Sequence, residues 1–267
     1  MSDKLALAPT LRPETGFRRI ASGCAKAFDD HLAQVMVSDD PEGPHRARVA
    51  LRRFRSALTG FAPVIDPDAR RAMTDRARAL FRCLGRLRDA DVLLAGCVDP
   101  TEVAGLAADA DRIRGEVRAE LLEMAAAGYA AELQRRLKPD DWLRGDKRGK
   151  RWHRRGLPRL ARRALDRAWE ACAAHGTDLA ALAPDVRHEL RKELKTLRYL
   201  SEYFALFWPG AAQDRFLTHL RALQESLGTL NDLTLAPVPP EPDTIAATLA
   251  TATKALKLLV KAGPWWD

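Results

Sequence analysis

Residues 45–61 read HRARVALRRFRSALTGF, and residues 188–204 read HELRKELKTLRYLSEYF. The two stretches match at a constant offset of 143 residues. At this offset the basic residues pair one to one: His45 with His188, Arg48 with Arg191, Arg52 with Lys195, and Arg55 with Arg198. We call the first member of each pair the first cation row and the second member the second cation row.

The same offset continues outside these stretches. It pairs Pro41 with Pro184, Arg78 with Arg221, Leu84-Gly85 with Leu227-Gly228, and Asp89 with Asp232. A fixed spacing that holds over this distance without a gap predicts an internal duplication. The chain therefore consists of two copies of one unit, and each copy carries the same basic face.

Composition indicates a globular protein with an excess of positive charge. Of the 267 residues, 46% are hydrophobic and 30% are charged, which is not typical of a disordered chain. Forty-four Lys and Arg against thirty-six Asp and Glu give a net charge of +8. This excess predicts attraction to a polyanion, such as nucleic acid, an anionic membrane surface or polyphosphate.

The cysteines and the apolar segments indicate a cytoplasmic location. No two cysteines form a CxxC pair, so we interpret all four as small buried residues in a reducing compartment: Cys24, Cys83, Cys97 and Cys172. The N-terminal residues lack the apolar core of a signal peptide. No apolar run approaches the roughly 20 residues that span a bilayer.

Apolar residues recur every three or four positions between Pro-rich and Gly-rich breaks, which predicts an all-α fold. We expect helices over 14–37, from Pro41 to about Phe61, and over 67–96, 100–137, 159–175, 184–207, 211–235 and 243–262. Short connections between long amphipathic helices predict two pseudo-symmetric four-helix bundles. The corresponding division is a first repeat over 1–139 with a tail over 1–12, a basic connector over 140–158, and a second repeat over 159–267.

Each cation row follows one face of its helix. At about 100° per residue, the four members of the first row fall within about 80° of arc. Leu51, Phe54, Leu58 and Phe61 fall on a separate face that we expect in the core. Like charges four residues apart repel each other, so such a row gains stability when an anion occupies it. On one helix alone we would interpret the row as a solvated face, but its duplication favours a binding site.

The two histidines should respond to the charge around them. Both lie close to the expected start of a helix, at Pro41 and at Pro184, where the helix dipole favours anions. Beside several arginines the imidazole should be neutral in the empty site, and beside phosphate it should protonate more easily. We therefore predict tighter anion binding as the pH falls from about 8 to about 6.

These motifs resemble the CHAD domain, the conserved histidine α-helical domain. The resemblance covers roughly residues 12–262 and rests on four segments: HRARVALRRFRSAL, RCLGRLRDADVLL, RHELRKELKTLRYLSEYF and LQESLGTLNDL. It implies two four-helix bundles related by a pseudo-two-fold axis, with the basic helices meeting at a central groove. It also implies binding of inorganic polyphosphate, in some members at polyphosphate granules. The binding set that it implies is His45, Arg48, Arg52, Arg55, His188, Arg191, Lys195 and Arg198.

Two features depart from the family pattern. Lys195 occupies a position where the first copy has Arg52, so this contact lacks the planar fork of a guanidinium. Thr196 pairs with Arg53, which indicates that Arg53 is peripheral. Some CHAD domains are fused to a triphosphatase domain of the CYTH type, and we expect none here, because the sequence shows no alternating Glu-x-Glu-x-Lys strand.

Further basic residues extend the candidate surface. The duplicated pairs Arg19 with Arg162 and Arg78 with Arg221 form either a secondary basic surface or ordinary surface salt bridges. Asp89 and Asp232 cannot bind phosphate directly. They either orient arginines, which we favour, or pair locally with neighbouring groups. Ten basic residues and one acid lie between Arg144 and Arg163. This segment is either an arm that clasps a polyanion, a nucleic-acid patch in which Trp152 stacks on a base, or a solvated linker.

The C-terminal segment allows two interpretations. Its helix over 243–262 fits a bundle better than a membrane surface. We expect Trp265 and Trp266 to cap a hydrophobic edge or to form an oligomer contact.

The sequence favours binding over catalysis. It contains no P-loop, no GxSxG, no HExxH and no carboxylate cluster that predicts a metal site. We expect a protein without enzymatic activity, cofactor or metal that holds inorganic polyphosphate. Two alternatives stay open: a nucleic-acid-binding protein that uses the same face and the 144–163 segment, and an interaction protein whose arginines pair with an acidic partner.

Overall fold

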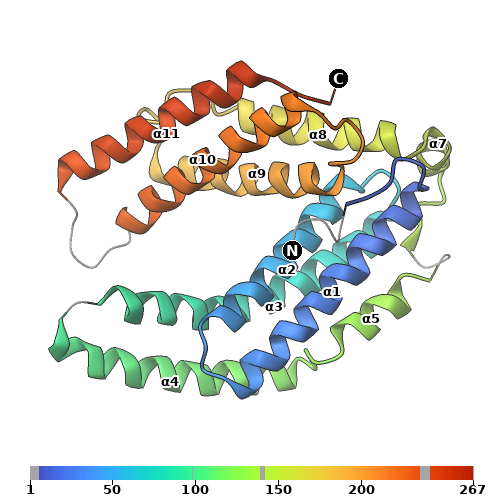
Figure 1. Cartoon of the computed structure of the whole chain (residues 1–267). Helices are drawn as coiled ribbons and strands as arrows, with labels where there is room; N and C mark the ends of the chain where they lie inside the picture. Colours follow the sequence, from blue (N-terminus) through green and yellow to red (C-terminus); the bar gives the residue numbers. More distant parts are fainter. Residues whose placement is uncertain (1–5, 98, 139–141, 235–240, 267) are drawn as a thin grey trace. The chain divides into compact units, whose positions relative to one another are not determined.

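The computed structural model describes residues 6–97, 99–138, 142–234 and 241–266, and these residues form ten helices and no strand (Figure 1). The prediction of an all-α fold is confirmed. The helices are α1 Pro13–Val37, α2 Glu42–Gly60, α3 Pro67–Gly96, α4 Pro100–Glu123, α5 Tyr129–Arg136, α7 Lys147–Arg155, α8 Leu157–Ala173, α9 Pro184–Tyr203, α10 Ala211–Thr234 and α11 Pro242–Ala262.

The chain divides into two compact units. The N-terminal unit is Arg12–Arg154, and the C-terminal unit comprises the residues from Arg155 onward together with the segment that ends at Leu11. The order of helices repeats between them, since α1 to α4 correspond to α8 to α11. The ends of α2 and α9 lie 143 residues apart, at Gly60 and Tyr203. This agreement is what an internal duplication predicts.

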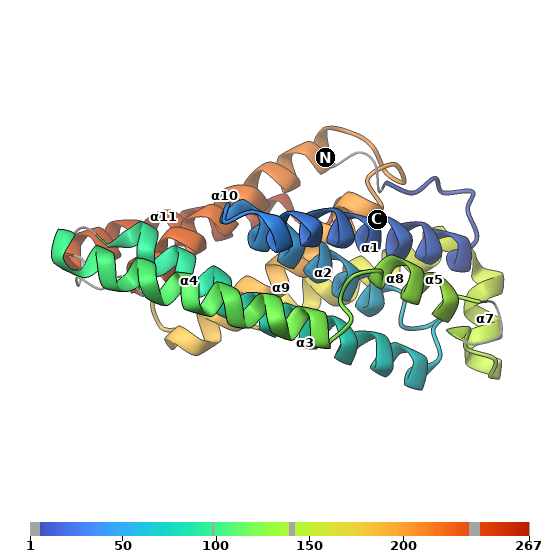
Figure 2. The same cartoon turned by 90° about the horizontal axis from the view of Figure 1, so that it is seen from below.

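In the N-terminal unit, α1 packs against α2, α2 against α3 and α3 against α4, and α5 packs against α1. Figure 2 shows α3 and α4 running side by side. Aromatic side chains fill the centre of this unit. The ring of Phe17 lies 6.4 Å from Phe54, 5.6 Å from Phe61 and 5.0 Å from Trp142, centroid to centroid. This core fixes the buried face of α2, so its cation row lies on the other side.

The single helix expected over 100–137 is wrong, because α4 ends at Glu123 and α5 begins at Tyr129. Between them the backbone takes a positive φ at Ala125 (46°) and at Gly128 (80°), which no α-helix allows. The carbonyls of Met124 and Ala125 accept hydrogen bonds from Arg76 of α3. A tertiary contact therefore stabilises the break.

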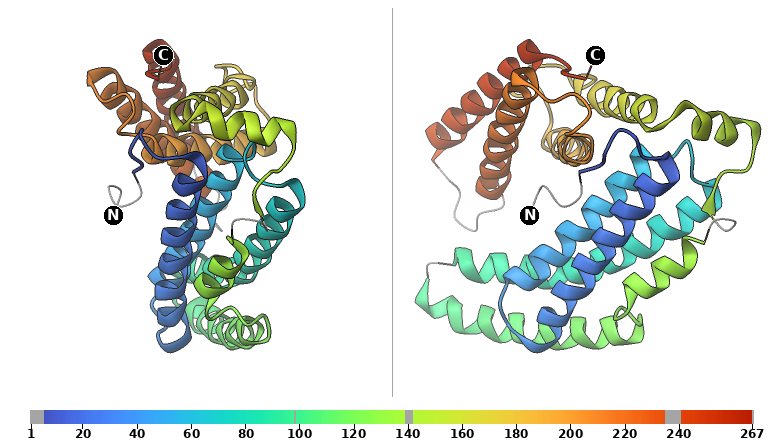
Figure 3. Two further views of the ribbon diagram at one scale, coloured as in Figure 1. Left: turned by 90° about the vertical axis from the view of Figure 1, so that its right-hand side faces the viewer. Right: turned by 45° about the vertical axis from the view of Figure 1, so that its right-hand side comes forward.

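In the C-terminal unit, α9 packs between α8 and α10, and α11 packs on α10 (Figure 3). Trp265 and Trp266 are buried, and Trp266 donates a hydrogen bond from Nε1 to Asp166 of α8 at 2.8 Å. The two tryptophans thus cap the core of this unit. The buried Leu7 donates its amide to the carbonyl of Tyr203 at 2.9 Å, which attaches the N-terminal segment to the C-terminal unit.

The basic connector contains a helix, α7, in place of the flexible arm that we considered. Trp152 is 9% exposed and belongs to the core, so its indole does not face solvent for base stacking. His153 lies 3.1 Å from Glu14 of α1, which ties α7 to the N-terminal unit. Residues 140 and 141 of the connector lie outside the described residues, as do Pro139, Pro237, Pro239 and Pro240.

The four cysteines form no disulfide. Cys24, Cys83 and Cys172 are buried as expected, whereas Cys97 is partly exposed. Burial raises the pKa of Cys83 and of Cys172 to about 12. Within the described ranges, every helix is too short or too polar to span a membrane.

Candidate anion-binding site

The first cation row lies on α2, which begins directly after Pro41 as expected. Ala47, Leu51 and Phe54 of this helix are buried in the core. On the other side of α2, His45 is exposed, and Arg48, Arg52 and Arg55 are half-buried. The separation of apolar and basic faces predicted from the helical period is therefore present in the structure.

Arg48 lies against Gly85 of α3. A Cβ atom at Gly85 would stand 2.8 Å from Nη1 of Arg48, so only glycine permits this approach. Asp89 lies 3.9 Å from the same nitrogen, but its side chain is 82% exposed whereas that of Arg48 is 17% exposed. In the described part of the chain, this Nη1 has no hydrogen-bond acceptor. Asp89 therefore acts on Arg48 as a distant charge and does not hold it by a direct hydrogen bond.

Phe81 of α3 lies beneath three arginines of the first row. The guanidinium carbons of Arg48, Arg52 and Arg55 lie 4.3, 5.3 and 5.8 Å from its ring centroid. These distances are within the range of cation–π attraction. Sequence reasoning missed Phe81 because it lies on the next helix and because its counterpart in the second copy is Gln224. The available signal was its position four residues before Gly85, on the same face of α3.

Further positive charge comes from α3. The charge of Arg88 acts on His45 and Arg48, and that of Arg78 acts on Arg55. Burial and these neighbouring cations lower the pKa of Arg48 and of Arg55 from their usual value, although the guanidinium groups stay charged. Arg88 is a second residue that sequence reasoning missed. Its counterpart Asn231 is neutral, so the duplication did not reveal it.

The surroundings of His45 lower its pKa, which is the direction that the sequence predicts. Partial desolvation is the largest cause that lowers its pKa, followed by the positive charge of Arg88, while the carboxylate of Glu42 acts in the opposite direction. The imidazole is therefore neutral at pH 7 in the free protein.

The second cation row lies on α9, and two of its members, His188 and Arg191, line a pocket between α9 and α10. The pocket walls come from both helices: Pro184, Arg187, His188 and Arg191 of α9, and Leu227, Leu230, Asn231 and Thr234 of α10. A Cβ atom at Gly228 would stand 3.4 Å from Nη2 of Arg191. Each row therefore places the arginine three residues after its histidine against the duplicated glycine of the next helix.

Carboxylates are more frequent near the second row. Arg198 lies 3.7 Å from Glu202, and its guanidinium carbon lies 4.9 Å from the ring of Tyr199. Glu189 pairs with Lys192, and Glu193 pairs with His175, both at 2.7 Å. Neither of these two partners belongs to the second row. Lys195 is half-buried on the same helix. Thus the second row is partly balanced by acids, whereas Arg52 and Arg55 of the first row have no carboxylate within 4.0 Å among the described residues.

The secondary basic residues lie at the surface of their helices. Arg19 on α1, Arg162 on α8 and Arg221 on α10 are exposed, and Arg78 on α3 is exposed with Asp75 at 3.7 Å. For Arg78 the surface salt bridge that we considered is therefore present. Asp232 accepts a hydrogen bond from Asn231 at 3.3 Å.

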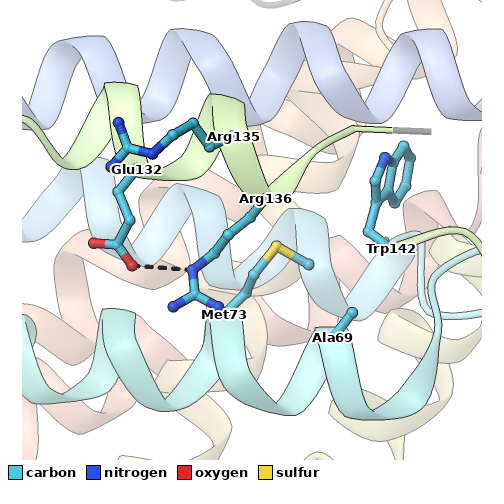
Figure 4. A pocket seen from close by; sticks show the side chains of 6 residues that line it. All are labelled: Ala69, Met73, Glu132, Arg135, Arg136 and Trp142. Atoms are coloured by element: carbon cyan, nitrogen blue, oxygen red, sulfur yellow. Dashed lines mark hydrogen bonds and ion pairs between the residues drawn. The ribbon is translucent and has the colours of Figure 1, made fainter. Parts of the chain in front are cut away.

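A separate cavity of about 440 Å³ lies in the N-terminal unit between α3, α5 and Trp142 (Figure 4). Its walls contain none of the residues that the sequence singles out for binding. Arg136 points toward Glu132 and pairs with it at 3.0 Å, as Figure 4 shows. In the described segments, no group of three or more His, Cys, Asp or Glu side chains could hold a metal ion.

Comparisons with known proteins agree with this architecture. The CHAD domain family matches residues 19–237. The crystal structure of the CHAD domain from the plant Ricinus communis superposes with a TM-score of 0.63 and 23% identity, covering 99% of this chain and 92% of that chain. PptA from Streptomyces chartreusis superposes with a TM-score of 0.54 and 18% identity, covering 94% and 96%. These two likenesses show the fold. A comparison with curated proteins finds no match.

Proposed function

This chain belongs to the CHAD domain family, and from that premise we propose that it is a non-enzymatic protein that binds inorganic polyphosphate. The family is linked to polyphosphate. The observation that carries the proposal is the duplicated cationic arrangement. In both units the arginine three residues after the histidine lies against a glycine of the next helix, Arg48 at Gly85 and Arg191 at Gly228.

Geometry and charge favour a polymeric anion. Successive members of a row lie one turn apart, about 5–6 Å along the helix axis, which suits a line of phosphates better than one compact anion. The cations outnumber the nearby carboxylates, and on the first row the nearest carboxylate is the exposed Asp89. Arginine binds phosphate through charge-assisted hydrogen bonds that are often bidentate.

The arrangement of aromatic side chains favours polyphosphate over nucleic acid. Single-stranded nucleic acid binds by stacking its bases on exposed aromatic rings. Trp152 is buried, and the ring of Phe81 is covered by guanidinium groups. Polyphosphate has no bases and needs only the cations.

Competition binding at fixed salt tests the proposal. We expect long polyphosphate to displace labelled polyphosphate far better than RNA of equal charge. Arg48→Ala and Arg191→Ala should each weaken binding by about tenfold or more, because a charge-assisted contact contributes about 1.5–3 kcal/mol. RNA that competes as well as polyphosphate would contradict the proposal.

We also propose that the protein works in the cytoplasm and binds polyphosphate granules. The basic rows and the family support this location. Fluorescence microscopy of the tagged chain in cells stained for polyphosphate tests it, and diffuse signal in granule-rich cells would count against it.

A further inference from the structure

The two cation rows have diverged although their spacing is the same. Helix α2 carries five arginines and one acid, Glu42, whereas α9 carries five basic residues and four acids. The position beneath the row also differs. It is Phe81 in the N-terminal unit and Gln224 in the C-terminal unit, where the amide donates a hydrogen bond to the carbonyl of Leu194 at 2.7 Å.

The aromatic ring of Phe81 can hold arginines together by cation–π attraction, which the side chain of Gln224 cannot do. The negative face of its ring attracts Arg48, Arg52 and Arg55 to within 5.8 Å and opposes their mutual repulsion. Long side chains lose rotamer freedom when they bind a ligand, so arginines that are already gathered lose less. The side-chain amide of Gln224 is hydrogen-bonded to the backbone of α9, and it offers no aromatic ring to Arg191.

We propose that Phe81 is a positioning residue that preorganises the first cation row and makes it the tighter of the two anion sites. This inference rests on the proposed function. The nearby cation Arg88 acts in the same direction, since its counterpart in the second row is the neutral Asn231. The second row, which pairs Arg198 with Glu202, is then the weaker of the two anion sites.

Substitution of the ring in the full-length protein tests this inference. Phe81→Leu keeps an apolar side chain but removes the ring, whereas Phe81→Tyr keeps the ring face. Gln224→Leu is the matched control at the duplicated position. Affinity for long polyphosphate is measured for each by titration calorimetry at several salt concentrations, after melting curves have established that the variants fold. If Phe81→Leu does not fold, Phe81→Met replaces it, because methionine also fills the space without a ring.

We expect Phe81→Leu to bind about tenfold more weakly, or about 1.4 kcal/mol. Its affinity should also depend less steeply on salt, because scattered arginines contact fewer phosphates at once. Phe81→Tyr and Gln224→Leu should stay within about twofold of the wild type, since both leave the gathered arginines in place. Arg48→Ala should cost more affinity than Arg191→Ala.

Three results would overturn the inference alone: an unchanged affinity of Phe81→Leu, an equal loss in Phe81→Tyr, or a greater loss in Arg191→Ala than in Arg48→Ala. A wild-type protein that binds no polyphosphate at low salt would instead overturn the proposed function. The two failures are thus distinguishable.

Discussion

At the scale of single residues, the site depends on how closely a guanidinium approaches the neighbouring helix. Arg48 and Arg191 both lie over a glycine, but the space differs. An added Cβ would stand 2.8 Å from Arg48 at Gly85, and 3.4 Å from Arg191 at Gly228. The first arginine would have to move, whereas the second would remain close to its place.

Gly85→Ala should therefore weaken polyphosphate binding several-fold, while Gly228→Ala should change it little. Both substitutions replace glycine inside a helix by a better helix former, worth about 1 kcal/mol, so neither should lower the melting temperature. Calorimetric titration and thermal melting of the two variants check this. Equal losses of affinity in both would show that the close approach of Arg48 does not matter.

His45 should make polyphosphate binding dependent on pH. Its pKa in the free protein is lowered, and a bound phosphate favours the protonated ring, so the pKa is higher in the complex. Binding then takes up a proton. Affinity should rise as the pH falls through the pKa of the complex, and it should stop rising below the pKa of the free protein, which lies under the usual value of about 6.5.

Titrations between pH 8 and pH 5.5 of the wild type and of His45→Gln measure this dependence. His31→Gln on α1 serves as the control, since His31 bonds Gln34 and lies outside the cation rows. If the affinity of His45→Gln depends on pH in the same way as that of the wild type, protonation of His45 does not contribute to binding.

At the scale of helices, a buried ion pair fixes α3 to α4 near the first row. Arg114 of α4 lies 2.8 Å from Asp91 of α3, and their side chains are 9% and 4% exposed. Arg114 also reaches Asp111 at 2.9 Å and Asp39 in the loop before α2 at 3.4 Å. Desolvation raises the pKa of Asp91, so its charge depends on this partner.

Arg114→Ala should lower the free energy of unfolding by about 3 kcal/mol at pH 7, because Asp91 is then buried without its cation. The loss should shrink toward pH 5, since the folded state takes up a proton on Asp91 that the unfolded state does not. Urea unfolding of the wild type and the variant at pH 7 and pH 5 measures this loss in the free energy of unfolding. Arg112→Ala, which removes an exposed arginine from the same helix, should change stability little. A similar small change in Arg114→Ala would contradict the structural role of the pair.

The sequence predicts the limits of a helix well where residues within that helix determine them. Expected and observed limits agree within two residues for α1, α3 and α10, because Pro13, Pro67 and the apolar period act locally. The break between α4 and α5 depends on hydrogen bonds from Arg76, which lies about fifty residues away, so no local pattern reveals it. For the same reason the sequence predicts both cation rows but misses Phe81 and Arg88. Their roles arise where α3 meets α2, and the second copy has Gln224 and Asn231 instead.

At the scale of the whole molecule, an excess of cations in two duplicated rows should make binding strongly dependent on salt. Each phosphate contact releases condensed counterions, so affinity should fall linearly with the logarithm of the salt concentration. Arg48→Ala and Arg191→Ala should each make this slope shallower by about one. Titrations from low to physiological salt measure the slopes, and an unchanged slope in either variant would place that arginine away from the polyanion.

The most direct test of the account is the affinity of the Arg48→Ala/Arg191→Ala double variant for long polyphosphate at fixed salt. The matched control is Arg112→Ala/Arg215→Ala, which removes the same charge from exposed positions on α4 and α10. Arg215 lies nine residues before Gln224, which places it on the opposite face of α10. We predict that the double variant loses affinity by about a hundredfold or more, while the control stays within about threefold of the wild type. Wild-type affinity in the double variant, or an equal loss in the control, would contradict the claim that these two rows form the site.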